Sequence, residues 1–235
     1  MSARAFVFAV AGLLPCLASG PAIAQVNWEV GFKGGASLAE LTGDTGLSES
    51  IDAGPYVFTI SGDIGDIKSG FTGGGFATAR FGDRWGVRFE VLYEQAGSKG
   101  TIEFGQNGVP TGSAEVTYRL DYIEVPILAV GTFAAGRAAR VDVFAGPALA
   151  FVLDAKLKSA GDTFTSEEDI GNSTQDTDIG FAAGAGLSFP VSPAVHIVVD
   201  GRYTLGFSDV LNSRENVKNG GFAFMTGISL PIGAP

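Results

Sequence analysis

Cysteine, histidine and charged side chains are all scarce in this chain of 235 residues. It has one cysteine, Cys16, and one histidine, His196, and only 17% of its residues are charged. Cys16 lies in an N-terminal segment that we expect to be removed, so the mature chain would form no disulfide and no cysteine-ligated metal site. Its removal also excludes a cysteine nucleophile. The 35 glycines and 18 phenylalanines are unusual for a helical globular protein.

The first 24 residues have the features of a cleavable signal peptide. Arg4 gives them a basic start, residues 5–18 are nearly all apolar, and residues 22–24 (AIA) form a small-x-small cleavage site. We expect cleavage after this site, which leaves residues 25–235 as one domain. Cys16 leaves open the alternative of a lipoprotein acceptor, which is disfavoured because a proline stands before it where a small residue is needed.

After the signal peptide, no apolar run approaches the roughly 20 residues of a transmembrane helix. The chain must therefore be soluble or enter a membrane as strands. Apolar and polar residues alternate with a period of two, which is typical of half-buried strands. In one segment, for example, Val87, Phe89 and Val91 alternate with Arg88 and Glu90. Eight segments are expected to be strands: 26–38, 71–81, 85–95, 116–131, 140–157, 178–189, 195–207 and 221–232.

The connections between these segments differ in length and in charge. Long and short connections alternate, as they do in outer-membrane barrels with short periplasmic turns and longer external loops. Without Arg4, 14 of the 15 basic residues remain against 25 acidic ones, and the resulting net charge of −11 lies in the long connections. The sequence therefore predicts four mobile acidic loops at one end of an electrically neutral barrel. The long connections are 39–70, 96–115, 159–177 and 208–219, and the short ones are 82–84, 132–139 and 190–194.

The alternation alone allows two arrangements of the apolar face. A soluble eight-stranded barrel of the lipocalin type would place this face inside, whereas a membrane barrel would turn it toward lipid. Lipid is favoured because the apolar face carries almost no charge, and one Arg or Lys at the bilayer midplane costs roughly 2–4 kcal/mol. In lipid, strands can cross only as a closed barrel, because every backbone donor must be paired. We therefore predict an all-β fold, an eight-stranded antiparallel transmembrane up-and-down β-barrel.

One segment departs from the pattern. From Val116 to Tyr122 the apolar residues are even-numbered, and this phase, if continued, would turn Glu124 toward lipid. We expect a phase slip or β-bulge near residues 121–125 that returns Glu124 to the lumen. Pro126 lacks a donor for the strand ladder and fits such an irregularity.

Five blocks of sequence resemble a known family. The blocks are GFKGGASLAELTGD (31–44), SGFTGGGFATARFGDRWGVRFEVLYEQAGSKG (69–100), LDYIEVPILAV (120–130), VFAGPALAFVLDAK (143–156) and DIGFAAGAGLSF (178–189). Because of the order and spacing of these blocks, the chain resembles the PorT-like family of small outer-membrane β-barrel domains over essentially its whole mature length. The resemblance implies an eight-stranded barrel in the outer membrane of a Gram-negative bacterium. It implies no single activity, although one branch of the family assists protein secretion.

Charged residues on the polar face are expected to meet inside the barrel. Eight strands leave an interior just wide enough for side chains to fill, and buried charges need partners. We therefore expect a network of paired charges across a plugged lumen, with a narrow porin-like channel as the alternative. The candidate lumen residues are Glu29, Lys33, Arg80, Arg88, Glu90, Glu94, Arg119, Asp121, Glu124, Asp142, Asp154, Lys156, Asp200 and Arg202.

The remaining function classes are catalysis and surface interaction. Barrels that modify lipids use a nucleophile, a histidine and a carboxylate near the external rim, whereas His196 follows a short turn and has no serine beside it in the sequence. We expect no catalytic residue, no cofactor and no metal site. Acidic external loops suit a structural or surface-interaction role in adhesion or envelope integrity. They leave open an extracellular ligand, including calcium.

The expected partners follow from the membrane location and the charge. They are outer-membrane lipid, lipopolysaccharide and the barrel-assembly machinery, and we expect a monomer. Nucleic-acid binding is disfavoured by the acidity of the chain.

Overall fold

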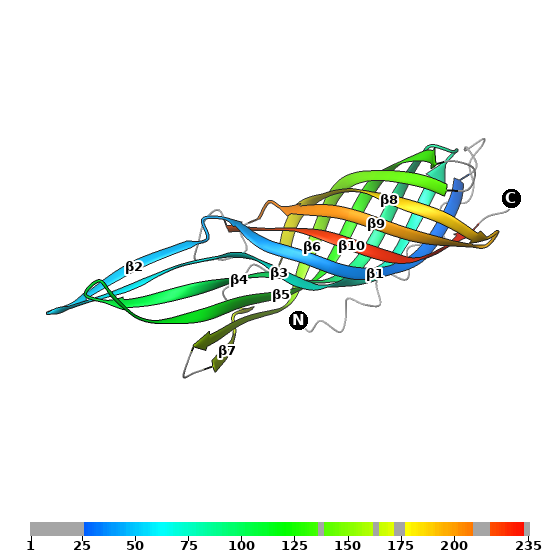
Figure 1. The fold of residues 1–235 in the computed structure, drawn as a ribbon. Helices are drawn as coiled ribbons and strands as arrows, with labels where there is room; N and C mark the ends of the chain where they lie inside the picture. Colours follow the sequence, from blue (N-terminus) through cyan, green and yellow to red (C-terminus); the bar gives the residue numbers. More distant parts are fainter. Residues whose placement is uncertain (1–25, 136–138, 162–164, 172–176, 209–216, 233–235) are drawn as a thin grey trace.

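The computed structural model describes residues 26–135, 139–161, 165–171, 177–208 and 217–232 (Figure 1). The expected signal peptide and its cleavage site lie outside these residues. The described part of the chain is built from β-strands. No helix in the described ranges is long and apolar enough to cross a membrane.

Eight of the strands form a closed antiparallel ring. β1 pairs with β3 on one side and with β10 on the other, and the remaining neighbours follow in chain order. This ring confirms the predicted eight-stranded antiparallel barrel. The ring strands are β1 (Val26–Gly43), β3 (Tyr56–Phe81), β4 (Trp85–Gln106), β5 (Val109–Ala135), β6 (Ala139–Gly161), β8 (Thr177–Ser192), β9 (Val195–Gly206) and β10 (Val217–Ile232). Two shorter strands, β2 (Gly46–Ala53) and β7 (Thr165–Asp169), lie outside the ring and pair with β3 and β6.

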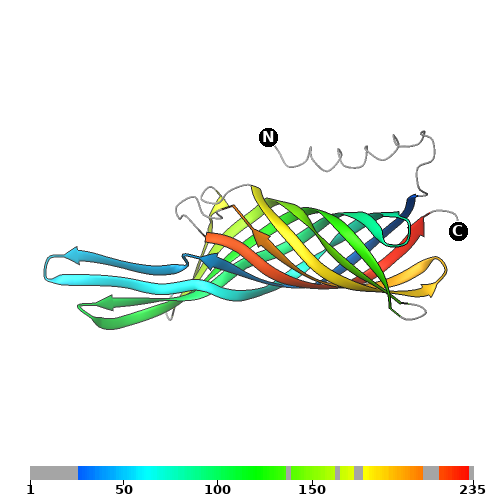
Figure 2. The same cartoon turned by 90° about the horizontal axis from the view of Figure 1, so that it is seen from above.

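The two ends of the barrel differ. β1 begins and β10 ends at the same end, where Trp28 lies opposite Ile232. The tight turns between β3 and β4 and between β8 and β9 lie at this end too, and the long connections leave from the opposite end (Figure 2). We call these the turn end and the hairpin end.

The barrel wall is apolar outside and polar inside. On β4, Arg88, Glu90 and Leu92 are at most 3% exposed, whereas Phe89 and Val91 between them are 45% and 43% exposed. Other ring strands contribute exposed apolar residues to the same outer surface, among them Phe32, Phe71, Val143, Phe181, Ile197 and Phe224. The apolar face therefore points away from the barrel axis, as in a lipid-facing wall and unlike the soluble alternative.

Two of the four connections expected to be mobile loops are β-hairpins. Residues 46–63 form β2 and the first part of β3, and residues 98–114 form adjoining parts of β4 and β5. Both hairpins extend the wall far beyond the ring (Figures 1 and 2). Their acidic residues alternate with apolar ones, as in Ile102-Glu103-Phe104, and so occupy one face of a strand instead of a loop.

The other two long connections are described only in part. In 159–177, β7 pairs with the end of β6. Most of 208–219 lies outside the described residues.

The irregularity expected near residues 121–125 lies on the neighbouring strand. β5 keeps its even-numbered residues inward without a phase slip, so Tyr122 and Glu124 are 3% and 2% exposed. The register between β5 and β6 shifts between Asp121 and Tyr122, where Leu153 of β6 has no opposite residue. Glu124 does point inward, but so does Tyr122, which we expected to face lipid. The even apolar residues of β5 fill the lumen near the hairpin end.

Candidate functional site

Charged side chains pair across the barrel interior, beginning at the turn end. Arg80 Nη2 lies 2.9 Å from a carboxylate oxygen of Glu29 and 2.9 Å from one of Asp142. Arg140 reaches Glu29 at 3.1 Å, and the Thr132 hydroxyl donates a hydrogen bond of 2.8 Å to Asp142. This layer joins β1, β3, β5 and β6 through side chains alone.

A second layer crosses the middle of the barrel. Lys33 Nζ lies 2.6 Å from Glu90 and 2.7 Å from Asp200. Arg88 bridges Asp200 at 3.2 Å and Asp142 at 3.0 Å. The side chains of all five residues are at most 5% exposed. Buried charges are strongly destabilising when a partner is missing, so this layer is stable only as a complete set.

Two aromatic rings line the middle layer. The guanidinium carbon of Arg88 lies 5.2 Å from the ring centroids of both Phe76 and Phe144. The ammonium of Lys33 lies 5.5 Å and 5.9 Å from the same two centroids. Cations at these distances are attracted by the faces of aromatic rings. The rings therefore hold the cations in place while occupying cross-section of the lumen.

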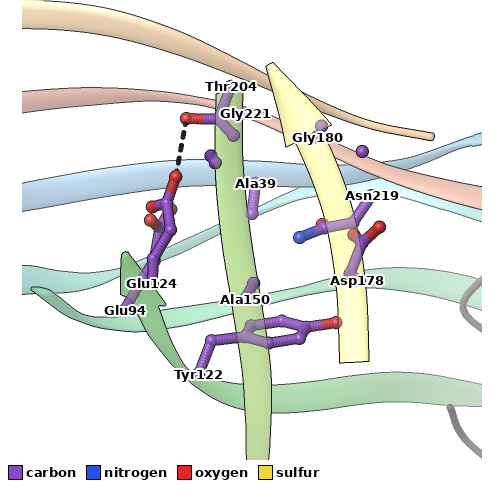
Figure 3. A pocket seen from close by; sticks show the side chains of 13 residues that line it. Ala39, Glu94, Tyr122, Glu124, Ala150, Asp178, Gly180, Thr204, Asn219 and Gly221 are labelled. Atoms are coloured by element: carbon purple, nitrogen blue, oxygen red, sulfur yellow. Dashed lines mark hydrogen bonds between the residues drawn. The ribbon is translucent and has the colours of Figure 1, made fainter. Parts of the chain in front are cut away.

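The third layer, toward the hairpin end, is centred on one cation. The guanidinium of Arg202, whose side chain is 1% exposed, lies 3.3 Å from Glu90 and 3.2 Å from Glu94, and it donates a shorter hydrogen bond to Glu124. Thr204 hydrogen-bonds to the second oxygen of Glu124 (Figure 3). Arg202 thus bridges three carboxylates, and it is the cation that pairs with Glu94 and Glu124, whereas Glu90 also pairs with Lys33.

A small cavity follows this layer. Its volume is about 30 Å³, and its lining includes Glu94, Glu124, Tyr122 and Asp178. Figure 3 shows the Tyr122 hydroxyl directed toward Asp178. The volume is enough for ordered water and too small for an organic ligand. Among the described residues, no group of three His, Cys, Asp or Glu side chains is arranged to hold a metal ion.

Apolar side chains close the lumen beyond the cavity. Leu41, Leu120, Tyr122 and Val217 belong to one buried cluster, and each is at most 3% exposed. Leu41 and Val217 come from the neighbouring strands β1 and β10, and Leu120 and Tyr122 come from β5 on the opposite side of the ring. The lumen therefore passes from paired charges to an apolar closure at the hairpin end.

The structure places ten of the fourteen candidate lumen residues in these layers. The ten are Glu29, Lys33, Arg80, Arg88, Glu90, Glu94, Glu124, Asp142, Asp200 and Arg202. Arg140 belongs to the first layer and was missed, although it stands two residues before Asp142 on the same strand, where the period of two would have included it.

The other four candidates, expected in the lumen, point to the outer face of the wall, where Tyr93 and Arg119 bond to the carboxylate of Asp121 and leave this residue only 6% exposed. Arg119 pairs with Asp121 at 2.8 Å, and Lys156 pairs with Asp154 at 3.0 Å. The first pair is odd-numbered on β5, whose even residues point inward, and the bulge at Leu153 moves the second pair outward on β6. The hydrogen bond to Asp154 raises the pKa of Lys156. This charged outer patch marks where the apolar band of the wall ends.

His196 lies at the turn end among charged partners. Its Nδ1 is 3.7 Å from Glu29 Oε1 and 3.4 Å from Arg140. Ser229 lies opposite His196 in the register of β9 and β10, but its hydroxyl bonds to Glu29. In the described part of the chain, no hydrogen bond joins a serine hydroxyl to the imidazole. The arrangement is that of a structural charge cluster and lacks an activated nucleophile.

A family model described as the outer membrane protein beta-barrel domain matches residues 23–212, which is most of the chain. The chain belongs to this family. An outer membrane protein beta-barrel domain resides in the bacterial outer membrane, and the exposed apolar wall is the surface that such a location requires. Short turns of these barrels face the periplasm, so the hairpin end points out of the cell.

Several outer-membrane proteins of known structure are similar to this chain. Neisserial surface protein A is 18% identical and has a TM-score of 0.43, with 88% of this chain and 98% of that chain covered. OprG from Pseudomonas aeruginosa is 12% identical with a TM-score of 0.45, covering 88% and 96%. Ail of Yersinia pestis is 16% identical with a TM-score of 0.40, covering 87% and 98%. No curated protein matches the sequence.

Proposed function

We propose that this barrel is a surface-interaction protein whose filled ring anchors the β2–β3 and β4–β5 hairpins outside the cell. The observation that carries the proposal is the outer sheet, defined as residues 46–63 and 101–114. There β2, β3, β4 and β5 continue as one four-stranded antiparallel sheet beyond the ring. A barrel that needed only to span the membrane would have no use for paired strands of this length.

The charge of the outer sheet supports a role in recognition. It contains Glu49, Asp52, Asp63 and Glu103 and no lysine or arginine. Like charges on a rigid sheet favour cationic partners and raise their rate of association. The inner layers, in contrast, pair their charges and offer nothing to a partner in solution.

Shortening both hairpins is expected to remove the interaction without unfolding the barrel. The variant replaces residues 47–62 and 103–113 with Asn-Gly, because Gly46 pairs with Asp63 and Ile102 pairs with Ala114. A two-residue Asn-Gly turn fits such a junction. Attachment of expressing bacteria to cell monolayers and to plastic should fall to the level of bacteria without the protein, while the heat-dependent gel mobility of the barrel is kept. Undiminished attachment would contradict the proposal.

A narrow channel is the second candidate, and the layers of ion pairs oppose it. An ion crossing the barrel would have to displace Lys33, Arg88 and Arg202 from buried carboxylates. We expect the purified protein to give no steady conductance in a planar bilayer under concentrated KCl, with an open porin as the positive control. Stable unit currents that vanish in empty bilayers would favour the channel.

The finer assignments belong with this proposal. We propose membership of the PorT-like family on the five sequence blocks. We also propose a monomer without catalytic activity that contacts lipopolysaccharide and is inserted by the barrel-assembly machinery. The ties of His196 to Glu29 and Arg140 support the absence of catalysis.

A further inference from the structure

The outer sheet has two unlike faces. Paired residues of antiparallel strands point to the same side, so the register assigns each side chain to a face. Ile51 pairs with Phe58, and Ile60 pairs with Phe104. The apolar face carries Leu47, Ile51, Phe58, Ile60, Ile102 and Phe104, and one acidic residue, Glu49, lies on it opposite Ile60. The polar face carries Ser48, Ser50, Asp52, Thr59, Asp63 and Glu103.

The apolar face lies outside the lipid and is partly uncovered. Ile51, Tyr56 and Phe58 are 55%, 49% and 42% exposed. The face continues the inward side of β5 through Ala114, which is 3% exposed, so it looks toward the barrel axis and not toward the bilayer. Apolar residues that gather on the water-exposed face of a sheet mark an interaction surface.

The β2 edge of this sheet is open. β2 pairs with β3 on one side, and no other described strand pairs with it. Alternate backbone N–H and C=O groups of residues 47–53 therefore point away from the sheet. An open edge beside an apolar face is the arrangement to which extended peptides add as a further strand.

Charge decides which strand can be added. Both faces of the open edge strand carry a carboxylate, Glu49 beside Ile51 on the apolar face and Asp52 on the polar face, and the polar face also carries Asp63 and Glu103 on β3 and β4. A second copy of β2 would bring the same carboxylates together, and charges on an edge strand are a known device against such self-pairing. A strand with basic residues on the polar side would relieve this repulsion.

We propose that the β2 edge accepts an extended peptide segment in which basic and apolar residues alternate. Its backbone adds to residues 47–53, its apolar side chains extend the apolar face beside Ile51, and its basic side chains lie beside Asp52 on the polar face. This inference rests on the proposed surface-interaction function and names the chemical class of the partner.

The test uses a fluorescent nine-residue peptide of alternating lysine and valine and the full mature protein in nanodiscs. Two further peptides carry N-methyl groups on all valines or on all lysines. Because the N–H groups of alternate residues in a strand point to opposite edges, one of these sets faces β2 and the other faces water. Strand addition predicts that one methylated peptide loses at least about tenfold in affinity, since several ladder hydrogen bonds vanish together, while the other keeps its affinity.

Charge variants give an independent readout. Asp52→Lys should weaken binding of the lysine-valine peptide by roughly threefold, in the range of an exposed ion pair. It should strengthen binding of a glutamate-valine peptide. Asp83→Lys makes the same charge change in the turn between β3 and β4, at the far end of the barrel, and should alter neither affinity.

Three results would overturn the proposal: no binding of the unmethylated peptide, equal affinity of the two methylated peptides, or equal effects of Asp52→Lys and Asp83→Lys. Each would leave the proposed function in place if hairpin shortening still abolished attachment. If attachment did not depend on the hairpins, the proposed function itself would fail, whatever the peptides showed.

Discussion

Replacing Arg202 with methionine is expected to lower the unfolding free energy of the barrel by about 3–5 kcal/mol, the typical effect of removing one partner of a buried ion pair. Arg202 is 3% exposed and contacts Glu90, Glu94 and Glu124. Methionine keeps an unbranched apolar chain in place of the arginine stem but has no charge, so the three carboxylates would lose their shared partner. Urea unfolding followed by the heat-dependent gel shift would measure the change.

Two further variants separate lost pairing from general damage to the wall. Lys156→Met removes an exposed cation from the outer charged patch and should leave the urea midpoint unchanged. Adding Glu124→Gln to Arg202→Met should recover part of the loss, because one stranded carboxylate becomes neutral. If Arg202→Met were as stable as the parent, the third layer would contribute little to the fold.

Much of the ring was predictable because lipid makes the period of two unusually strict. A residue such as Phe89, between Arg88 and Glu90, can face only one way when one side is hydrocarbon and the other is a crowded lumen. That constraint located all eight ring strands and ten members of the inner layers. Which residues pair across the lumen depends on the curvature and stagger of the ring, as with Lys33 and Asp200, which lie 167 residues apart.

The period of two gave wrong side-chain directions where a β-bulge interrupts the pleat of a strand. A single unpaired residue, Leu153, reverses the sides of everything after it on β6, and so Asp154 and Lys156 were misplaced. Nothing in the local sequence marks this position as a bulge. The misassignment of Arg119 and Asp121 had another cause, since β5 fills its lumen face with apolar residues near the hairpin end.

One of the two hairpins, the one between β4 and β5, carries a turn signal in its sequence. Asn107-Gly108 is flanked by alternating residues, and both central residues have positive φ, 52° and 78°, as a type I′ turn requires. The acidic and glycine-rich composition of the connection 96–115 favoured a loop over a hairpin. Outside the membrane, acidic residues are as compatible with the polar face of a strand as with a loop.

Replacing Gly146 with valine is expected to prevent formation of the heat-stable barrel. Gly146 lies on β6, where a Cβ atom would stand 2.0 Å from the carbonyl oxygen of Ile127 and 3.1 Å from the Cα of Leu128. These neighbours belong to the backbone of β5 and cannot rotate away. The adjacent strands would have to separate, at a cost at or above the roughly 1–3 kcal/mol of ordinary overpacking.

The neighbouring residue supplies the matched control. Ala145 is next to Gly146 on β6 and points to the outer face, so Ala145→Val adds bulk toward lipid and should leave the gel shift intact. Gly146→Ala should fall between the two, since its single methyl group already meets the Ile127 carbonyl. If the Gly146→Val protein still showed the heat-dependent gel shift, this would contradict the prediction. It would mean that β5 and β6 leave room for a side chain between Gly146 and the Ile127 carbonyl. The strict need for glycine at an inward position is thus a direct measure of how tightly this narrow ring is closed.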